Sequence, residues 1–456
     1  MSTGVSAGVG GAGANRRSLS AYGFMALPLA FAGMPLYIYM PDFYVREWGL
    51  SLSAAGLILL LLRCIDAGQD LVIGHVCDRL PARRGWIMLI GGVVLSAGMA
   101  AVLYGPPMVG LAALSSSWVV GAWFGMSIAL AALGLSVISI NLALIGGFWQ
   151  TQAHGRLRVA AWRESFMLAG MMLAVVLPVI LQNYMDAADG FVMVFWVFAV
   201  FMLGSGFFFH CFWRQHGSSF AMSAAADVQS WRFFHGNKTF FAACFLTHLA
   251  ASLPAALFLF FVRDYLGIAA AAGLFLLLYL GSGILGMPVW QRLAAQYGQA
   301  RAWTLSMGLA ILAFGATLLI APGSATAFAV ICLLSGAALG ADLSIPPAMM
   351  AARLAARGQT AQGSRAFAVM NMIPKIALGV ASGGALLVLG QMGYRAGAPD
   401  NTPQVLSLLA VLYAGVPCVL KAGAAWMLRV AEINFQQGES NEFFERSSGD
   451  GRYHGS

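Results

Sequence analysis

Charge is what this sequence has least of. Only 9% of its 456 residues are Asp, Glu, Lys or Arg, against roughly 25% in soluble globular domains, and 60% are hydrophobic. Runs such as AAGLFLLLYLGSGILGMPVW (271–290) are long enough to cross about 30 Å of hydrocarbon as a helix. The alternating apolar segments typical of an outer-membrane β-barrel are missing. The composition therefore excludes a chain of soluble domains and predicts an all-α membrane protein.

The sequence also lacks the residue clusters that catalytic and metal sites need. Its six cysteines are scattered without a CxxC spacing, and no His, Glu and Asp cluster suggests a nucleophile–base or metal constellation. We therefore expect no enzyme activity and no cofactor other than a coupling ion, Na+ or H+. No convincing signal peptide precedes the first apolar run, so residues 1–20 are expected to be a disordered cytoplasmic leader before the first span.

Twelve apolar stretches predict twelve spans. They lie near 21–40, 53–77, 86–104, 112–147, 160–182, 191–213, 239–262, 269–291, 302–321, 326–350, 365–390 and 404–428. Two related junctions, GHVCDRLPARRGW (74–86) and GMPVWQRLAAQYGQARAW (286–303), begin 212 residues apart, as two repeated six-helix bundles require. We expect bundles at 21–213 and 239–428, joined by a cytoplasmic linker (214–238) and followed by a cytoplasmic tail (429–456).

Positive charge is distributed unevenly over these segments. Of the 25 Lys and Arg residues, 20 are assigned to the cytoplasmic side, three to external loops and two to span interiors, when Arg163, Arg365 and Lys421 in the cytoplasmic halves of their spans are counted with the cytoplasmic side. This positive-inside pattern predicts a multi-pass protein of a bacterial-type inner (plasma) membrane with both termini cytoplasmic. It also explains the net charge of +8 through contact with lipid head groups, so the expected partners are the bilayer and a small-molecule substrate, without nucleic acid. We expect a monomer.

One apolar run carries three charged residues, in LLRCIDAGQDLVIGHVCDRL (61–80). On a helix, Arg63, Asp66, Asp70 and Gly74 fall within an arc of about 80°. Charges at mid-bilayer are costly unless they are paired or hydrated, and they mark functional sites. Arg63 can neutralise one carboxylate, which leaves one negative charge for a monovalent cation or a proton. The alternative is an inert Arg–Asp network that locks this span to a neighbour.

The same run ends in a charged cluster at the predicted cytoplasmic mouth. Asp78, Arg79, Arg83 and Arg84 lie between the second and third spans. They serve as a positive-inside anchor in any case. We also predict that they form a gate latch, which breaks and re-forms as the two bundles rock.

Polar residues of the fourth and fifth spans are further candidates. Ser136, Ser139 and Asn141 could supply neutral oxygens to a cation or substrate, although such residues often only pack against or bond a neighbouring helix. Arg163 and Glu164 open the fifth span, where a substrate-facing charge and an interfacial snorkelling pair are both plausible.

The second half carries its own charged residues within spans. Asp342 is followed by Pro346 and Pro347, which predict a break in the helix and a cavity lining. Lys375 lies deep in the eleventh span, one turn after Asn371. We expect Lys375 to respond to the arrival and departure of the cation, the alternative being a static salt bridge to a residue such as Asp342.

The order and spacing of these residues resemble those of a known transporter family. PDFYVREWGLSLSAAGLILLLLRCIDAGQDLVIGHVCDRL (41–80) resembles the glycoside–pentoside–hexuronide:cation symporters, the melibiose-permease-like branch of the major facilitator superfamily. That family shows a pattern like P-x-F-Y…LGLS…R-x-x-D-A-x-x-D-P-x-x-G…DR. AWRESFMLAG, GADLSIPPAM, NMIPKIALG and LGQMGYRAG continue the match in order, over about residues 20–428. The resemblance implies the major facilitator fold, 12 transmembrane helices in two six-helix bundles, and Na+- or H+-coupled symport of a sugar-like solute.

The resemblance also implies roles for the cation-site residues. Asp66 and Asp70 occupy the family's cation-carboxylate positions, and Arg63 its neighbouring arginine. Ser136 falls near the cation-binding hydroxyl. Gln69 stands where a family Asn often helps to coordinate sodium, so we include it in the predicted coupling site.

The sugar pocket departs further from the family pattern. Arg163 and Lys375 match its arginine and lysine positions, but 26–37 (ALPLAFAGMPLY) lacks the acidic sugar ligand of the first span, and Ser139 replaces another acidic ligand. Leu71 also replaces the usual Pro. The alternative function is an exporter or flippase of an apolar or lipid-like solute on the same fold. The predicted substrate-binding set is Arg163, Glu164, Asn141, Ser139, Lys375, Asn371 and Asp342.

Overall fold

The computed structural model describes residues 15–106, 117–181, 184–217, 232–395, 397–398 and 401–449, and these residues form helices and turns without a strand. In chain order the α-helices are α1 (Arg16–Gly23), α2 (Ala26–Met34), α3 (Met40–Glu47), α4 (Leu52–Arg79), α5 (Arg84–Tyr104), α6 (Ser117–Trp149), α7 (Ala153–Leu181), α8 (Ala187–His216), α9 (Arg232–Phe260), α10 (Ala272–Tyr297), α11 (Gln299–Thr317), α12 (Ala325–Ala356), α13 (Gly363–Gln391), α14 (Pro403–Ala410) and α15 (Val416–Gly449). Three π-helical turns, Pro35–Tyr39, Phe261–Tyr265 and Val411–Gly415, continue the first, seventh and last passes.

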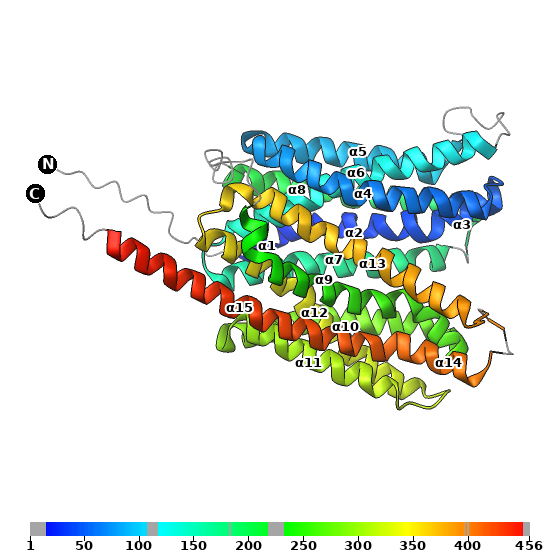
Figure 1. The fold of residues 1–456 in the computed structure, drawn as a ribbon. Helices are drawn as coiled ribbons and strands as arrows, with labels where there is room; N and C mark the ends of the chain where they lie inside the picture. Colours follow the sequence, from blue (N-terminus) through cyan, green and yellow to red (C-terminus); the bar gives the residue numbers. More distant parts are fainter. Residues whose placement is uncertain are drawn as a thin grey trace, which may run out of the picture.

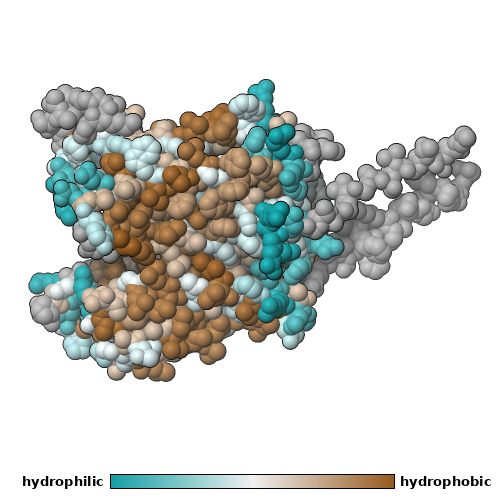
Figure 2. Space-filling model, turned by 180° about the vertical axis from the view of Figure 1, so that it is seen from behind, coloured by the Kyte–Doolittle hydropathy of each residue, from teal (hydrophilic) through white to brown (hydrophobic). Residues whose placement is uncertain are grey.

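These helices cross an apolar layer twelve times in the described part of the chain. Ten helical stretches are long and apolar enough to span a membrane, and α4 and α11, with 28 and 19 residues, complete the set. Figure 2 shows the matching surface, an apolar belt between two polar ends. Figure 1 shows α1–α8 gathered in one bundle and α9–α15 in a second bundle beside it. The predicted all-α architecture of two six-helix bundles is confirmed.

The two ends of the molecule differ. We call the end where α1 begins and α15 ends the terminus side, and the opposite end the far side (Figure 1). The α4–α5, α6–α7, α10–α11 and α12–α13 junctions all lie on the terminus side. On the far side the surface is hollowed between the two bundles, at the left of Figure 2.

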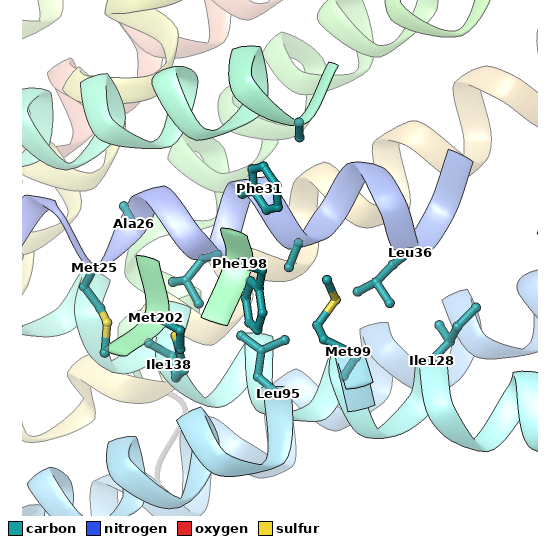
Figure 3. Packing of buried hydrophobic residues seen from close by; sticks show 14 of the residues in the cluster. Met25, Ala26, Phe31, Leu36, Leu95, Met99, Ile128, Ile138, Phe198 and Met202 are labelled. Atoms are coloured by element: carbon teal, nitrogen blue, oxygen red, sulfur yellow. The ribbon is translucent and has the colours of Figure 1, made fainter. Parts of the chain in front are cut away.

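Apolar side chains and close helix contacts hold the first bundle together. Figure 3 shows Phe198 beside Leu95 in its interior, with Phe31 on the neighbouring helix α2, and all three are fully buried. Helices α5 and α6 approach closely because glycine faces backbone in their contact. A methyl group at Gly98 would lie 2.4 Å from the backbone nitrogen of Ala131. Small residues permit this close packing, which supplies van der Waals contact where the hydrophobic effect between helices is weak.

The predicted disordered leader, residues 1–20, is partly helical in the structure. Residues 1–14 lie outside the described residues, but residues 16–20, predicted as disordered, belong to α1. The Asn15 side chain caps this helix by accepting a hydrogen bond from the Ser18 amide at 2.8 Å. Leu19 and Tyr22 bury one face of α1 in the first bundle. An N-cap and two buried side chains stabilise a short helix that composition alone does not predict.

The predicted tail, linker and helix break also differ from the structure. Helix α15 continues to Gly449, so the predicted tail is helical where the structure describes it. Of the predicted linker, 214–216 and 232–238 are helical, and 218–231 lie outside the described residues. The predicted helix break at Pro346 and Pro347 is wrong, because α12 passes through both. Within a membrane bundle, neighbouring helices and side chains can compensate for the missing N–H donors of proline.

The α5–α6 contact yields a stability prediction. Gly98→Ala should destabilise the protein by about 1–3 kcal/mol. The added methyl group meets the backbone of Ala131, which cannot move aside as a flexible side chain can. Gly315→Ala is the matched control, since a methyl group there meets nothing within 4 Å. Thermal unfolding in detergent, followed by intrinsic fluorescence, should show a melting temperature several degrees lower for the first variant alone. Equal melting temperatures for the two variants would contradict the close contact.

Candidate functional site

The charged face of α4 faces the second bundle. Asp66, Asp70, Gly74 and Asp78 follow one another at four-residue intervals and so lie along one side of the helix. The carboxylates are buried, with Asp66 4% and Asp70 0% exposed. The start of α4 is fixed by Ser51, whose hydroxyl accepts a hydrogen bond from the Ala54 amide at 3.2 Å. Helix α4 therefore holds a row of buried acidic groups at the bundle interface.

A lysine from the other bundle lies between the first two carboxylates. The Lys375 Nζ atom, on α13, is 2.8 Å from an Asp66 oxygen and 2.8 Å from an Asp70 oxygen. It also donates a hydrogen bond to the Ser136 hydroxyl of α6 at 2.8 Å. Oxygens from two helices of the first bundle thus surround one ammonium group of the second.

Amide side chains complete the cluster. Gln69 Nε2 donates to Asp66 Oδ1 at 2.8 Å, and Asn371 Nδ2 donates to Asp70 Oδ2 at 3.0 Å. The Ser136 hydroxyl lies 3.2 Å from Asp66 Oδ1. The structure therefore brings together six predicted residues. Asp66, Gln69, Asp70 and Ser136 come from the predicted coupling set, and Lys375 and Asn371 from the predicted substrate-binding set. With two carboxylates and one ammonium, the cluster carries a formal charge of −1.

Arg63 does not neutralise a carboxylate as predicted. Its guanidinium lies over the ring of Tyr37, 4.0 Å from the ring centre, in the π-helical turn of the first pass. Among the described residues no ion pair joins Arg63 to Asp66 or Asp70, and Lys375 pairs with both instead. A cation–π contact satisfies the guanidinium away from the carboxylates. No sequence pattern indicates this aromatic partner.

The alternative in which Lys375 forms a static bridge to Asp342 is also wrong. Asp342 pairs with Lys421 of α15 and accepts a hydrogen bond from Trp303 Nε1 at 2.9 Å. Asp342 and Lys421 are both buried inside the second bundle, with 6% and 3% exposure. Lys421, assigned to the cytoplasmic segments on sequence, is therefore a buried partner of an acidic residue.

Two predicted polar ligands of α6 lie away from the cluster. The Ser139 hydroxyl donates to the Leu135 carbonyl at 2.7 Å within its own helix. Asn141 Nδ2 donates to the Val137 carbonyl at 2.8 Å and lies 3.2 Å from the Cys77 sulfur. Neither residue contacts the carboxylates. In this conformation both act in helix packing, the other interpretation that the sequence allows.

Arg163 and Glu164 form a buried pair on α7. Arg163 Nε donates to Glu164 Oε1 at 2.9 Å, and the two residues are 8% and 3% exposed. Interfacial snorkelling is therefore wrong for this pair, because a snorkelling side chain keeps its charged end in water. Tyr22 packs nearby and donates its hydroxyl to the Leu142 carbonyl at 2.7 Å. The pair lies within the first bundle, and its role toward a substrate stays a prediction.

The predicted latch crosses the bundle interface through Asp78. Its Oδ1 accepts the Ser364 amide at 2.8 Å, and its Oδ2 accepts both the amide and Nε of Arg365 at 3.1 Å. Arg84 donates to the Ser364 hydroxyl at 3.3 Å. Asp78 thus caps the N-terminus of α13, where the helix dipole favours an anion.

The other members of the predicted latch behave differently. Arg79 and Arg83 are exposed at the terminus side, which suits their role as positive-inside anchors. The cross-bundle partner, Arg365, was missed because a sequence count assigns it only to the positive-inside set. Gly74 allows the close approach at this point, since a methyl group there would lie 2.6 Å from the Ala368 Cβ.

Comparisons with known proteins agree with this architecture. A family model described as MFS/sugar transport protein matches residues 21–434. No curated protein sequence matches the chain. A bacterial homologue of the iron transporter ferroportin, in an outward-facing state with soaked iron, has a similar structure, with a TM-score of 0.70 and 14% identity over 92% of this chain and 99% of that one.

Two sugar transporters share the fold as well. The proton:xylose symporter XylE has a TM-score of 0.61 and 14% identity over 90% of this chain and 94% of that one. The E. coli fucose:proton symporter FucP has a TM-score of 0.57 and 13% identity over 90% of this chain and 98% of that one. The chain belongs to the MFS/sugar transport protein family, and it is a secondary transporter with the major facilitator fold.

Proposed function

We propose that this transporter couples the symport of a small solute to Na+ or H+ at the Asp66–Asp70 site. Its terminus side faces the cytoplasm of a cell with a bacterial-type inner membrane, as the predicted positive-inside distribution favours even without the buried Lys421. The hollow on the far side then faces outward, and the Asp78 latch closes the cytoplasmic side. The single observation that carries the proposal is the position of Lys375 between two buried carboxylates.

The coupling ion and the Lys375 ammonium compete for the same oxygens. Carboxylate and hydroxyl oxygens are ligands that hard cations prefer, and here three such groups surround a positive charge. A cation or proton that binds Asp66 and Asp70 neutralises the charge that holds Lys375. The lysine is then free to leave α4, which removes an ionic link between the bundles.

Release of this link leads to the change in access. Helices α4 and α13 contact each other at the ion cluster and again at the latch, where Asp78 holds the start of α13. Once Lys375 has left, the Asp78 latch supplies a larger share of the interaction between α4 and α13. Rocking of the bundles then breaks the latch. The cation and the solute then reach the cytoplasm, and Lys375 returns to the carboxylates as the transporter resets.

We propose a sugar-like solute, imported by a monomer. The family description, and the xylose and fucose symporters that share the fold, support this class. Membership of the melibiose-permease-like branch is proposed on the sequence pattern around Arg63, Asp66 and Asp70. Arg163 and Glu164 are the candidate substrate ligands of the first bundle, and in that role they would become accessible from the space between the bundles during the cycle.

Substitution of the carboxylates should abolish coupling. In proteoliposomes supplied with radiolabelled pentoses, hexoses and glycosides, an imposed Na+ or proton gradient should drive accumulation by the wild type. Asp66→Asn and Asp70→Asn should reduce it by about tenfold or more, because loss of a charged ligand costs over ~1.4 kcal/mol of cation affinity. Asp186→Asn is the control, since Asp186 is exposed and makes no capping hydrogen bond.

Two results would overturn parts of this proposal. Gradient-driven accumulation of the same size in the wild type and in Asp70→Asn would exclude coupling at this site. A wild type that accumulates none of the sugars would exclude the sugar class and favour the exporter or flippase alternative.

Loss of the latch should expose the start of α13. In Asp78→Asn, one of the two side-chain positions becomes an NH2 group, which cannot accept a backbone amide, so either Ser364 or Arg365 loses its acceptor. Hydrogen–deuterium exchange over residues 363–367 should accelerate by roughly tenfold or more. Asp186→Asn is the control, because it alters an exposed carboxylate outside α13 that makes no capping hydrogen bond. Equal exchange rates in both variants and the wild type would show that Asp78 does not hold α13.

A further inference from the structure

A pocket lined by three arginines lies apart from the ion cluster. It has a volume of about 950 Å³ and opens on the terminus side of the second bundle, between α11, α12 and α15. Three arginines line it, Arg301, Arg353 and Arg429, one from each of these helices. Coupling and the latch use none of them.

Arg353 forms the buried floor of this pocket. It is 3% exposed, and its guanidinium lies 4.7 Å from the ring centres of both Phe240 and Phe435. It forms an ion pair with Glu432, whose side chain is 27% exposed at the pocket wall. A buried cation whose acidic partner is partly open to solvent can exchange that partner for another anion.

The remaining lining combines positive charge with exposed apolar surface. Arg301 and Arg429 are exposed, so the three arginines and Glu432 give the pocket a formal charge of +2. Leu305 and Ile433 line the same pocket and are 53% and 54% exposed. An apolar wall beside a cluster of guanidinium groups fits an amphiphile with an anionic head. A small soluble anion would contact the guanidinium groups but not the apolar wall.

We propose that this pocket binds an anionic phospholipid, whose head-group phosphate has no neighbouring ammonium to neutralise it. The head group lies between Arg301 and Arg429 above Arg353, and an acyl chain covers Leu305 and Ile433. Basic pockets between transmembrane helices near the membrane surface bind anionic lipid head groups in this way. Guanidinium groups suit the role because they donate paired hydrogen bonds to phosphate oxygens.

The pocket also includes the first residue of α7, which belongs to the other bundle. Ala153 lines it, and the Ala153 carbonyl accepts a hydrogen bond from Gln299 of α11 at 3.0 Å. A bound lipid therefore contacts both bundles on the terminus side. It stabilises the conformation in which this side is closed.

Native mass spectrometry of the purified full-length protein tests the site. The protein is titrated with phosphatidylglycerol or phosphatidylcholine, and with inorganic pyrophosphate in a separate arm. Phosphatidylglycerol should bind with about tenfold higher affinity than phosphatidylcholine, and the double variant R301Q/R429Q should lose that preference. The control R214Q/R292Q removes the same charge from two exposed arginines outside the pocket and should keep the preference.

A third variant distinguishes a loss of the site from a folding defect, because it is expected to bind lipid more tightly. E432Q removes the anion that competes for Arg353, so it should bind phosphatidylglycerol more tightly than the wild type. Equal lipid preference in R301Q/R429Q and R214Q/R292Q would overturn the site. Pyrophosphate that displaces phosphatidylglycerol at micromolar concentration would overturn the choice of a lipid, and would assign the pocket to a soluble phosphate compound.

Discussion

The structure depends on one antiparallel contact between α4 and α13. The two helices run in opposite directions across the apolar layer, and each step of about four residues along α4 meets a step of three or four residues along α13. Asp66 and Asp70 face Lys375 and Asn371, Gly74 faces Ala368, and Asp78 faces Ser364 and Arg365. Buried charges are destabilising unless they are paired, and removal of one partner costs roughly 3–5 kcal/mol. The pairing of the two bundles therefore also offsets part of the buried negative charge of α4.

In the proposed mechanism, ion recognition and closure lie on the same pair of helices. Asp70 and Asp78 are two helical turns apart, or about 12 Å along α4. At one end of the contact lies the Lys375 ammonium, which a bound cation replaces in this mechanism. The other end is set by a carboxylate that caps a helix and closes the terminus side. A change of charge at the first end alters the free energy of the whole contact, so binding at mid-membrane can control a gate nearer the surface.

Local sequence patterns were enough to predict the helical fold and to place Asp66 and Asp70 on one face of a helix, because hydrophobic length and the 3.6-residue period are local properties. The role of these carboxylates in ion binding stays a prediction. The side-chain pairs that form between helices could not be predicted from sequence in the same way. Arg63 stacks on Tyr37, and Lys375 rather than Arg63 joins the carboxylates, because side-chain partners depend on which helices meet. Arg365 was counted only as a positive-inside residue for the same reason.

Competition between Lys375 and the coupling ion is tested most directly by removing the ammonium. Na+ binding to Lys375→Met and to the wild type can be compared by isothermal titration calorimetry at pH 8, and proton binding by the pH dependence of thermal stability. If the lysine competes for the carboxylates, the variant should bind the coupling ion at least about tenfold more tightly than the wild type. Binding that is weaker than in the wild type, or absent, would show that Lys375 helps to form the ion site and would contradict competition.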